Sequence, residues 1–231
     1  DNVILAADYS QIELRLLAHF CQDATLVEAF RTGQDIHRVV AAQVNGVSLE
    51  DVTPQQRSAA KAVNFGIIYG QSAFGLSRSI GIPVGEAQAF INTYFMRYPG
   101  IRLFIDDCIA RTKRTGYAET ILGRRRPVPD LQSRNRQQRA LGERIAVNTV
   151  VQGSAADLIK RAMIDIHREL KTGQHSARML IQVHDELVFE VPQRDVEREA
   201  EMIRQKMEHA MELSVPIVVD LAWGRTWAEG K

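Results

Sequence analysis

The chain has 231 residues, and 45% of them are hydrophobic, which is enough to bury a substantial core as one large domain or two small ones. Lys and Arg together number 29 against 28 Asp and Glu, so the formal net charge of +1 does not by itself indicate a nucleic-acid partner. Only two cysteines are present and no apolar run is long enough to span a bilayer. These features argue against a disulfide framework, a thiolate metal site and a membrane-spanning helix.

The charges are unevenly distributed along the chain. Between Arg111 and Arg144 ten cationic residues face three anionic ones, whereas between Asp185 and Glu212 nine acidic residues face four cationic ones. The charges of the two segments cancel in the net charge of the chain, but each segment creates a strong local electrostatic field. The chain begins at Asp1 rather than Met and enters a strand pattern within two residues, so we expect it to be a piece of a longer protein.

The hydrophobic periodicity predicts an α+β fold, with a small sheet built from both ends of the chain and a mainly helical insertion between them. Short apolar runs predict strands at residues 3–7, 179–183, 187–191 and 217–222, with a break at 184–186. Amphipathic spacing between Gly and Pro turn signals predicts helices at residues 11–20, 23–31, 35–45, 54–69, 84–97, 100–115, 134–171 and 195–213. Residues 116–130, rich in Arg and Pro, are expected to form a β-hairpin or an irregular loop.

One predicted helix carries an unusual stripe. Arg57, Lys61, Phe65 and Tyr69 follow one another at intervals of four residues, so a helix places them on one slowly drifting face. Two cations followed by two aromatic rings can hold a polyanion at one end and stack a planar ring at the other, as a nucleoside triphosphate requires. The alternative is a solvated cationic stripe with both rings in the core.

Two carboxylates end predicted strands. Asp8 follows the first strand and Asp185 lies at the tip of the late hairpin, so they are adjacent if the strands share a sheet. Paired carboxylates suit Mg²⁺, and the backbone carbonyl of Tyr9 can complete an oxygen-rich site. The alternative is that both are ordinary turn residues. His184 and Glu186 flank Asp185, but no paired histidine spacing supports zinc, and Glu186 is either a supporting carboxylate or a solvated hairpin residue.

Taken together, three segments resemble the sequence motifs of family A DNA polymerases. Residues 8–15 (DYSQIELR) resemble motif A, residues 57–70 resemble motif B, and residues 183–186 (VHDE) resemble motif C. They occur in the family's order and at its spacing. The resemblance also runs through residues 123–126 and 152–157 and covers essentially the whole chain, with bacterial members of the family as the best match.

The resemblance implies roles for individual residues. Two Mg²⁺ ions are held by Asp8, Asp185 and the Tyr9 carbonyl, and Lys61 joins the two aspartates in the catalytic set. Residues implied to bind the deoxynucleoside triphosphate are Gln11, Glu13, His37, Arg57, Lys61, Phe65 and Tyr69, with Glu13 as a steric gate against a ribose 2′-OH. Residues implied to contact primer–template DNA are Arg144, Asn148, Gln152 and His184. The run Arg124–Arg126 is either a solvated loop or a contact to phosphate or template.

The resemblance also implies an organisation and an activity. Residues 1–20 and 141–231 are expected to form a palm with a small antiparallel sheet, and residues 21–140 the fingers; the thumb and exonuclease domains are not in this sequence. The implied activity is template-directed DNA synthesis in replication and repair, by a monomer in a bacterial cytoplasm. A two-metal nuclease also uses Asp8 and Asp185 but leaves the stripe unexplained, and a third reading is a non-enzymatic nucleic-acid-binding module.

Overall fold

The structure is a computed structural model that describes residues 1–229. The chain divides into two compact units. Unit 1 combines Asp1–Glu13 with the segment from Ala155 onward, and unit 2 is Leu14–Ser154. The chain passes from one unit to the other within α1 (Ile12–Cys21) and again within the long helix α8 (Arg136–Leu170). The assignment of palm and fingers to residues 1–20, 21–140 and 141–231 stays a prediction.

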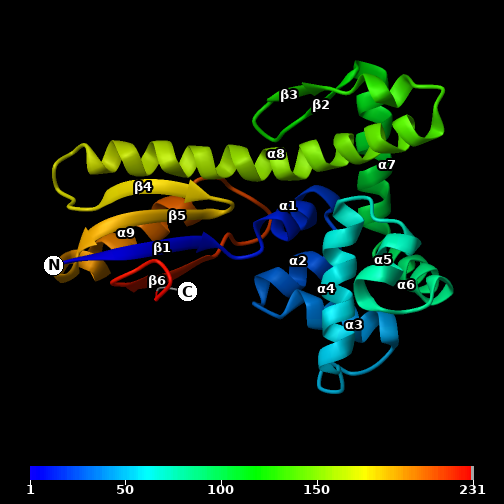
Figure 1. The fold of residues 1–231 in the computed structure, drawn as a ribbon, viewed down its shortest axis with the longest axis horizontal. Coiled ribbons are helices and arrows are strands. Elements are labelled where there is room, and N and C mark those ends of the chain that lie inside the picture. Colours follow the sequence, from blue (N-terminus) through cyan, green and yellow to red (C-terminus); the bar gives the residue numbers. More distant parts are fainter. Residues whose placement is uncertain (230–231) are drawn as a thin grey trace. The chain divides into compact units, whose positions relative to one another are not determined.

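Unit 1 is built on a four-stranded antiparallel sheet of order β4-β5-β1-β6. Its strands are β1 (Asn2–Tyr9), β4 (Arg178–Val183), β5 (Glu186–Pro192) and β6 (Val219–Gly224). Because β1 comes from the first residues and pairs with β5 and β6 from the last ones, the two ends of the chain share one sheet, as the blue, orange and red strands of Figure 1 show. The predicted α+β class with a small antiparallel sheet is confirmed.

The register of this sheet sets its core. Leu5 lies opposite Phe189 on one side and Trp223 on the other, and both Leu5 and Phe189 are fully buried. The 3₁₀ turn η2 (Gln193–Asp195) leads into α9 (Val196–Glu208), which packs on β1 and β6 through buried residues that include Ile203 and Met207. One face of the sheet is therefore buried. Because side chains alternate between the two faces of a strand, this burial determines which residues of each strand point away from the core.

Unit 2 is mainly helical. Besides the first part of α8, its elements are α2 (Ala24–Arg31), α3 (Ile36–Asn45), α4 (Pro54–Ile68), α5 (Ala73–Ile80), α6 (Val84–Arg97), α7 (Pro99–Thr115), β2 (Tyr117–Glu119), β3 (Arg125–Pro127) and η1 (Pro129–Gln132). Side chains of Asp23, Asp35, Thr53 and Ser72 cap the starts of four of these helices by accepting from backbone N–H groups. Local sequence thus determines where most of these helices begin.

The structure corrects some predicted bounds. The helix α5 was not predicted, although Ser72 caps its start and Gly81 ends it with φ of 72°. The predicted helix 195–213 ends at Glu208 with His209 as its C-cap residue, and the Glu208 carboxylate accepts a hydrogen bond from Val219 N of β6 at 3.1 Å. The break in the late hairpin is two residues long, and Glu186 belongs to β5. Among the described residues no helix is long and apolar enough to cross a membrane.

Candidate functional site

Within unit 1 the sheet brings Asp8 and Asp185 to the same end of two neighbouring strands. Asp8 is the penultimate residue of β1, and Asp185 occupies the two-residue turn between β4 and β5. The backbone N–H of Tyr9 donates to the Asp185 carbonyl at 3.1 Å, which ties the end of β1 to this turn. His184, the other turn residue, has φ of 53°, so the hairpin turns tightly just before Asp185. The predicted adjacency of the two strand ends is confirmed.

The electrostatics of this corner favour a cation. Burial, followed by the negative charges of Glu13 and Asp8, raises the pKa of Asp185 to about 6, while His184 acts in the opposite direction. Three carboxylates therefore repel one another where β1 ends and α1 begins. A positive ion in this corner would relieve that repulsion and hold Asp185 ionised at neutral pH.

The donors in this corner fit magnesium better than a softer metal. In residues 1–229 no group of three or more His, Cys, Asp and Glu side chains is arranged to hold a metal ion. Mg²⁺ keeps several of its waters and takes one or two carboxylates, so Asp8 and Asp185 are a sufficient oxygen set. The Tyr9 hydroxyl is not available to it, since it donates to the Met207 carbonyl at 2.9 Å in a buried position. Only the backbone carbonyl of Tyr9 can contribute.

Three other residues of unit 1 surround the two aspartates. Gln11 links β1 to α1 with φ of 55°, and its buried Oε1 has no hydrogen-bond partner among the described residues. Glu13 lies in the first turn of α1, close enough for its charge to act on Asp185. Glu186 lies opposite Asp8 on β5, and its Oε1 accepts from the Trp227 indole N–H at 2.6 Å. Glu186 is thus a buried, hydrogen-bonded residue and not a solvated one.

The stripe of unit 2 is carried by α4, as predicted. A capping box of Thr53 and Gln56 starts the helix, and Pro54 occupies its first turn. Arg57 and Lys61 are exposed, whereas Phe65 and Tyr69 are half-buried, and Tyr69 is the C-cap residue just past Ile68. The Arg57 Nε lies 2.5 Å from Oδ2 of Asp35, the N-cap residue of α3. The cationic half of the stripe therefore faces solvent beside the start of α3.

A second contact joins α3 to α4. His37 is 3% exposed and its Nδ1 lies 3.0 Å from Nδ2 of Asn64, which is 1% exposed. Burial lowers the pKa of His37 to about 4; Asp35 opposes this shift, and the charges of Arg57 and Lys61 add to it. His37 is therefore a neutral ring at pH 7. Sequence reasoning missed Asn64, because its importance depends on a tertiary contact that no local pattern reveals.

Three of the predicted DNA-contacting residues lie at intervals of four along the part of α8 that belongs to unit 2. Arg144 and Gln152 are exposed, and Asn148 is half-buried with an Oδ1 that has no hydrogen-bond partner among the described residues. The aliphatic part of Arg144 packs on Gly70, since a Cβ added at Gly70 would lie 2.5 Å from the Arg144 Cγ. α8 is thereby in contact with the end of the α4 stripe.

A hollow of about 520 Å³ lies at this contact. It is lined by Phe65, Tyr69 and Arg144 together with Ala62, Gly66, Gly70, Gln71, Ser72, Gly75 and Ser79. The side chains of Gln71 and Arg144 pack closely on the three glycines of the lining, and the two rings offer faces on which a planar group can stack. The aromatic half of the stripe thus borders a hollow that suits a nucleobase.

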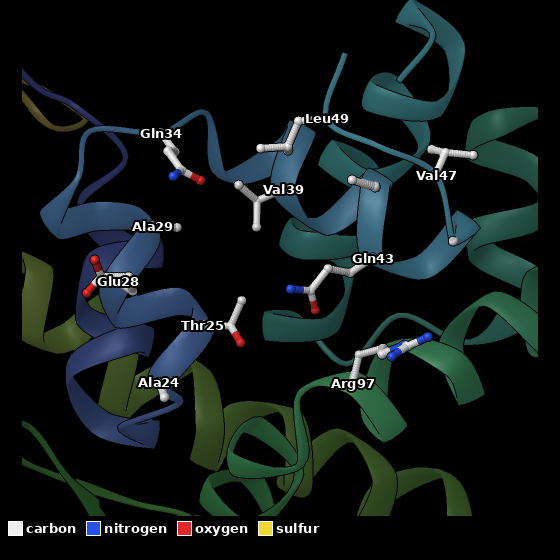
Figure 2. A pocket seen from close by; sticks show the side chains of 12 residues that line it. Ala24, Thr25, Glu28, Ala29, Gln34, Val39, Gln43, Val47, Leu49 and Arg97 are labelled. Carbon is white, nitrogen blue, oxygen red and sulfur yellow. The ribbon is translucent and has the colours of Figure 1, made fainter. Parts of the chain in front are cut away.

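A larger cavity of unit 2 contains none of the predicted residues. It measures about 880 Å³ and is lined by α2 and α3 with Arg97 at the end of α6. Figure 2 shows Thr25, Val39, Gln43 and Arg97 around it. Its lining mixes small apolar residues with exposed polar ones and brings together no catalytic or metal-binding group. Size alone does not make it the candidate site.

The run of three arginines lies in the β2–β3 hairpin. Arg125 is held within the hairpin, with its Nε 2.7 Å from Oε2 of Glu119 and its guanidinium 4.6 Å from the centre of the Tyr117 ring. All three arginines, Arg124, Arg125 and Arg126, are exposed. Whether they contact nucleic acid stays a prediction.

Comparisons with known proteins agree with the motifs. The sequence profile of DNA polymerase family A matches residues 1–229. DNA polymerase I of Streptococcus pneumoniae is 48% identical over 232 residues and that of Geobacillus stearothermophilus 49% identical over 231, each covering 100% of this chain. A solved structure described as the POL domain of Pol1 from M. smegmatis, in complex with DNA primer-template and dNTP, covers 99% of this chain with 42% identity and a TM-score of 0.94. The chain spans 26% of the length of these two relatives and 40% of the solved chain.

Proposed function

Because this chain belongs to DNA polymerase family A, we propose that it is the catalytic part of a template-directed DNA polymerase, which adds deoxynucleotides to a primer 3′-OH. The observation that carries the proposal is the hydrogen bond from Tyr9 N to the Asp185 carbonyl, which brings two distant motifs to one end of the sheet. Carboxylates from both motifs then form the oxygen-rich corner that phosphoryl transfer needs.

In this proposal Asp8, Asp185 and the Tyr9 carbonyl hold two Mg²⁺ ions. When bound, these ions would lower the pKa of the primer hydroxyl and stabilise the negative charge of the leaving pyrophosphate. The support from this chain is that burial, and after it the charges of Glu13 and Asp8, raise the pKa of Asp185; a divalent cation would offset both effects. The protein's own part is to hold these oxygens on rigid strand ends.

We assign the nucleotide to the stripe of α4 and to the residues that follow β1. Arg57 and Lys61 bind the triphosphate, and Lys61 also stabilises the charge that develops on the leaving phosphates. Phe65 and Tyr69 contact the base and sugar beside the hollow they line. His37 donates a hydrogen bond to a phosphate oxygen. Gln11 and Glu13 contact the sugar, and Glu13 excludes a ribose 2′-OH.

We assign primer–template DNA to Arg144, Asn148 and Gln152 of α8 and to His184 of the β4–β5 turn. The regular spacing of the first three residues lets one helix face follow a groove of the duplex. The NH₂ groups of Asn and Gln amides can donate hydrogen bonds to the minor-groove acceptors that all correct base pairs share. Arg144 supplies charge toward phosphate.

We propose that the protein acts in the bacterial cytoplasm and that it acts as a monomer. The support for the compartment is that the relatives named above are bacterial and that Cys21 and Cys108 are free thiols in the described residues. The support for a monomer is that one chain carries all of the proposed site residues.

The test is nucleotide incorporation on a short primed template by the 231-residue chain with Mg²⁺. Asp185→Asn keeps the shape of the side chain and removes its charge, so we expect incorporation to fall at least about a hundredfold. Affinity for primer–template should change by less than about threefold, since this carboxylate is assigned to metal and not to DNA. Asp165→Asn, at a half-buried aspartate of α8 that pairs with Arg161 and Arg168 in the same unit, is the matched control and should retain activity. Turnover by Asp185→Asn near the wild-type rate would contradict the metal assignment.

A further inference from the structure

The contact between His37 and Asn64 has a chemical consequence for nucleotide binding. His37 is the second residue of α3, where its backbone N–H donates to the N-cap carboxylate of Asp35 at 3.0 Å, so its backbone is fixed. Its ring lies 45° to that of Phe65 with centroids 5.9 Å apart. Asn64, from the middle of α4, reaches its Nδ1. Phe65 and Asn64 thus contact the ring, while Asp35 fixes the backbone that carries it.

The charged neighbours of His37 determine its protonation. Arg57 and Lys61 on α4 are cations, and Asp35 is the one anion among the charged groups acting on the ring, already engaged by Arg57. Burial together with two nearby cations disfavours a third positive charge. A neutral imidazole carries its proton on only one nitrogen, so the partner of one nitrogen decides the chemistry of the other.

The amide of Asn64 is that partner. With Nδ2 of Asn64 facing the ring at 3.0 Å and Oδ1 left without a hydrogen-bond partner among the described residues, the NH₂ group can only donate. This amide orientation makes Nδ1 of His37 the acceptor and places the ring proton on Nε2. In the opposite amide orientation Oδ1 would accept from Nδ1–H, and Nε2 would be left with a lone pair. An Nε2–H can donate to an anionic oxygen, whereas a lone pair there repels one.

We propose that Asn64 is a positioning residue that holds His37 as the Nε2–H tautomer, so that a buried neutral ring donates a hydrogen bond to a phosphate oxygen of the nucleotide. The assignment of a triphosphate to this face rests on the function proposed above, but the tautomer does not. Asn64 itself touches no substrate in this account. It acts through the ring, as partners of ligand-binding histidines commonly do.

The tautomer is measured directly by long-range ¹H–¹⁵N correlation spectra of the ¹⁵N-histidine-labelled chain at pH 7. Six histidines are present, and the signals of His37 are those lost in His37→Gln. We expect a protonated Nε2 and an acceptor-type Nδ1. A proton on Nδ1, or an imidazolium, would overturn the proposal. This experiment needs neither nucleotide nor DNA, so it stands even if the chain proves not to bind a triphosphate.

The consequence for binding is tested by a double-mutant cycle on the affinity for dATP with Mg²⁺. Asn64→Leu removes the amide from a buried position and keeps the branching and the number of heavy atoms of the side chain, and we expect it to weaken dATP binding about five- to tenfold. In the His37→Gln background Asn64→Leu should weaken dATP binding by less than about twofold, because Asn64 then has no ring to orient. Equal losses in both backgrounds would overturn the positioning role.

Asn92→Leu is the matched control, since Asn92 is an exposed asparagine of α6 in the same unit. It should leave both the His37 signals and the dATP affinity unchanged. If the wild-type chain binds no dATP while its spectrum shows Nε2–H, the proposed function fails and the tautomer stands. If Asn64→Leu does not fold, the wild-type spectrum still decides the tautomer.

Discussion

At the scale of single residues, the sequence predicts those members of the candidate site whose chemistry is matched by a local pattern. Asp8 and Asp185 stand at the ends of apolar runs, and the pairing of β1 with β5 confirms that those ends meet. Asn64 was not predicted, because an asparagine inside a helix has no recognisable pattern, and its contact with His37 of another helix is seen only in the structure. Glu186 was ambiguous for the same reason, since Trp227, its partner, lies far along the chain.

Glu13 carries a prediction that belongs to this scale. If its side chain fills the space of a ribose 2′-OH, Glu13→Ala should raise the use of ribonucleotides relative to deoxynucleotides at least about tenfold. The change opens space without touching the carboxylates assigned to metal. The measurement is the ratio of kcat/KM for ATP and dATP on the same primed template.

The control for that measurement is Glu197→Ala, an exposed glutamate at the start of α9 in the same unit. It removes an equal charge and should leave the ratio unchanged. An unaltered sugar preference in Glu13→Ala would remove the gate from the proposal while leaving the metal assignment intact. Glu13 also raises the pKa of Asp185, so the ratio is a safer measure than the absolute rate.

At the scale of elements, N-cap residues and helix-breaking Gly and Pro predict most helix bounds. The bounds that were predicted wrongly depend on tertiary contacts. Thr53, Pro54 and Gln56 predict the start of α4 from sequence alone. The end of α9 could not be predicted in this way, because the residues directly after Glu208 have ordinary helical character, and the contact of the Glu208 carboxylate with Val219 N is a tertiary one. The short α5 was hidden by its length and by Gly75 in its first turn.

The junction between α4 and α8 carries a prediction about packing. Gly70 combines φ of 66° with close contact to Arg144, whereas Gly46, which ends α3, has φ of 67° and nothing within 4 Å of an added Cβ. Gly46→Ala should therefore cost about 1 kcal/mol of backbone strain alone. Gly70→Ala should cost about 2–3 kcal/mol, because the added methyl group also displaces the Arg144 side chain.

Urea unfolding followed by circular dichroism at 222 nm measures both changes. Introducing Arg144→Ala should bring the cost of Gly70→Ala down to about that of Gly46→Ala, since the obstructing side chain is then absent. If Gly70→Ala remained equally costly without Arg144, the contact between α4 and α8 would not be the cause. The prediction concerns stability only and holds whatever the chain binds.

At the scale of the whole molecule, the division into two units was visible in the sequence only as a change of pattern. Strand-like runs at both ends and helical spacing between them predict the α+β class, which is confirmed. The boundaries could not be predicted, because the chain leaves and re-enters unit 1 inside helices α1 and α8, where periodicity does not change. Both tryptophans, Trp223 and Trp227, belong to unit 1, so their fluorescence reports on that unit.

This separation makes a stability prediction for unit 1 possible. The side chain of Glu199 is fully buried in α9, where it accepts from Ser176 N at 3.2 Å, lies 2.7 Å from Arg198 Nη2 and 3.0 Å from His175 Nδ1. Burial alone would raise the pKa of Glu199, but the bonds from Arg198 and Ser176 and the charge of His175 outweigh it and lower the pKa. The ionised carboxylate therefore stabilises the folded unit.

Because the folded pKa lies below the unfolded value of about 4.3, this contribution is fully present above that value and is lost as the pH falls through the folded pKa. Glu199→Gln should lower the free energy of unfolding at pH 7 by about 1–3 kcal/mol, a range that allows for the partial exposure of Arg198. The loss relative to wild type should shrink in acid, where the wild-type carboxylate is protonated. Tryptophan-monitored urea unfolding at pH 7 and in acid measures it, with the exposed Glu197→Gln of the same helix as control. A loss of the same size at every pH would mean that Glu199 acts through packing and not through its charge.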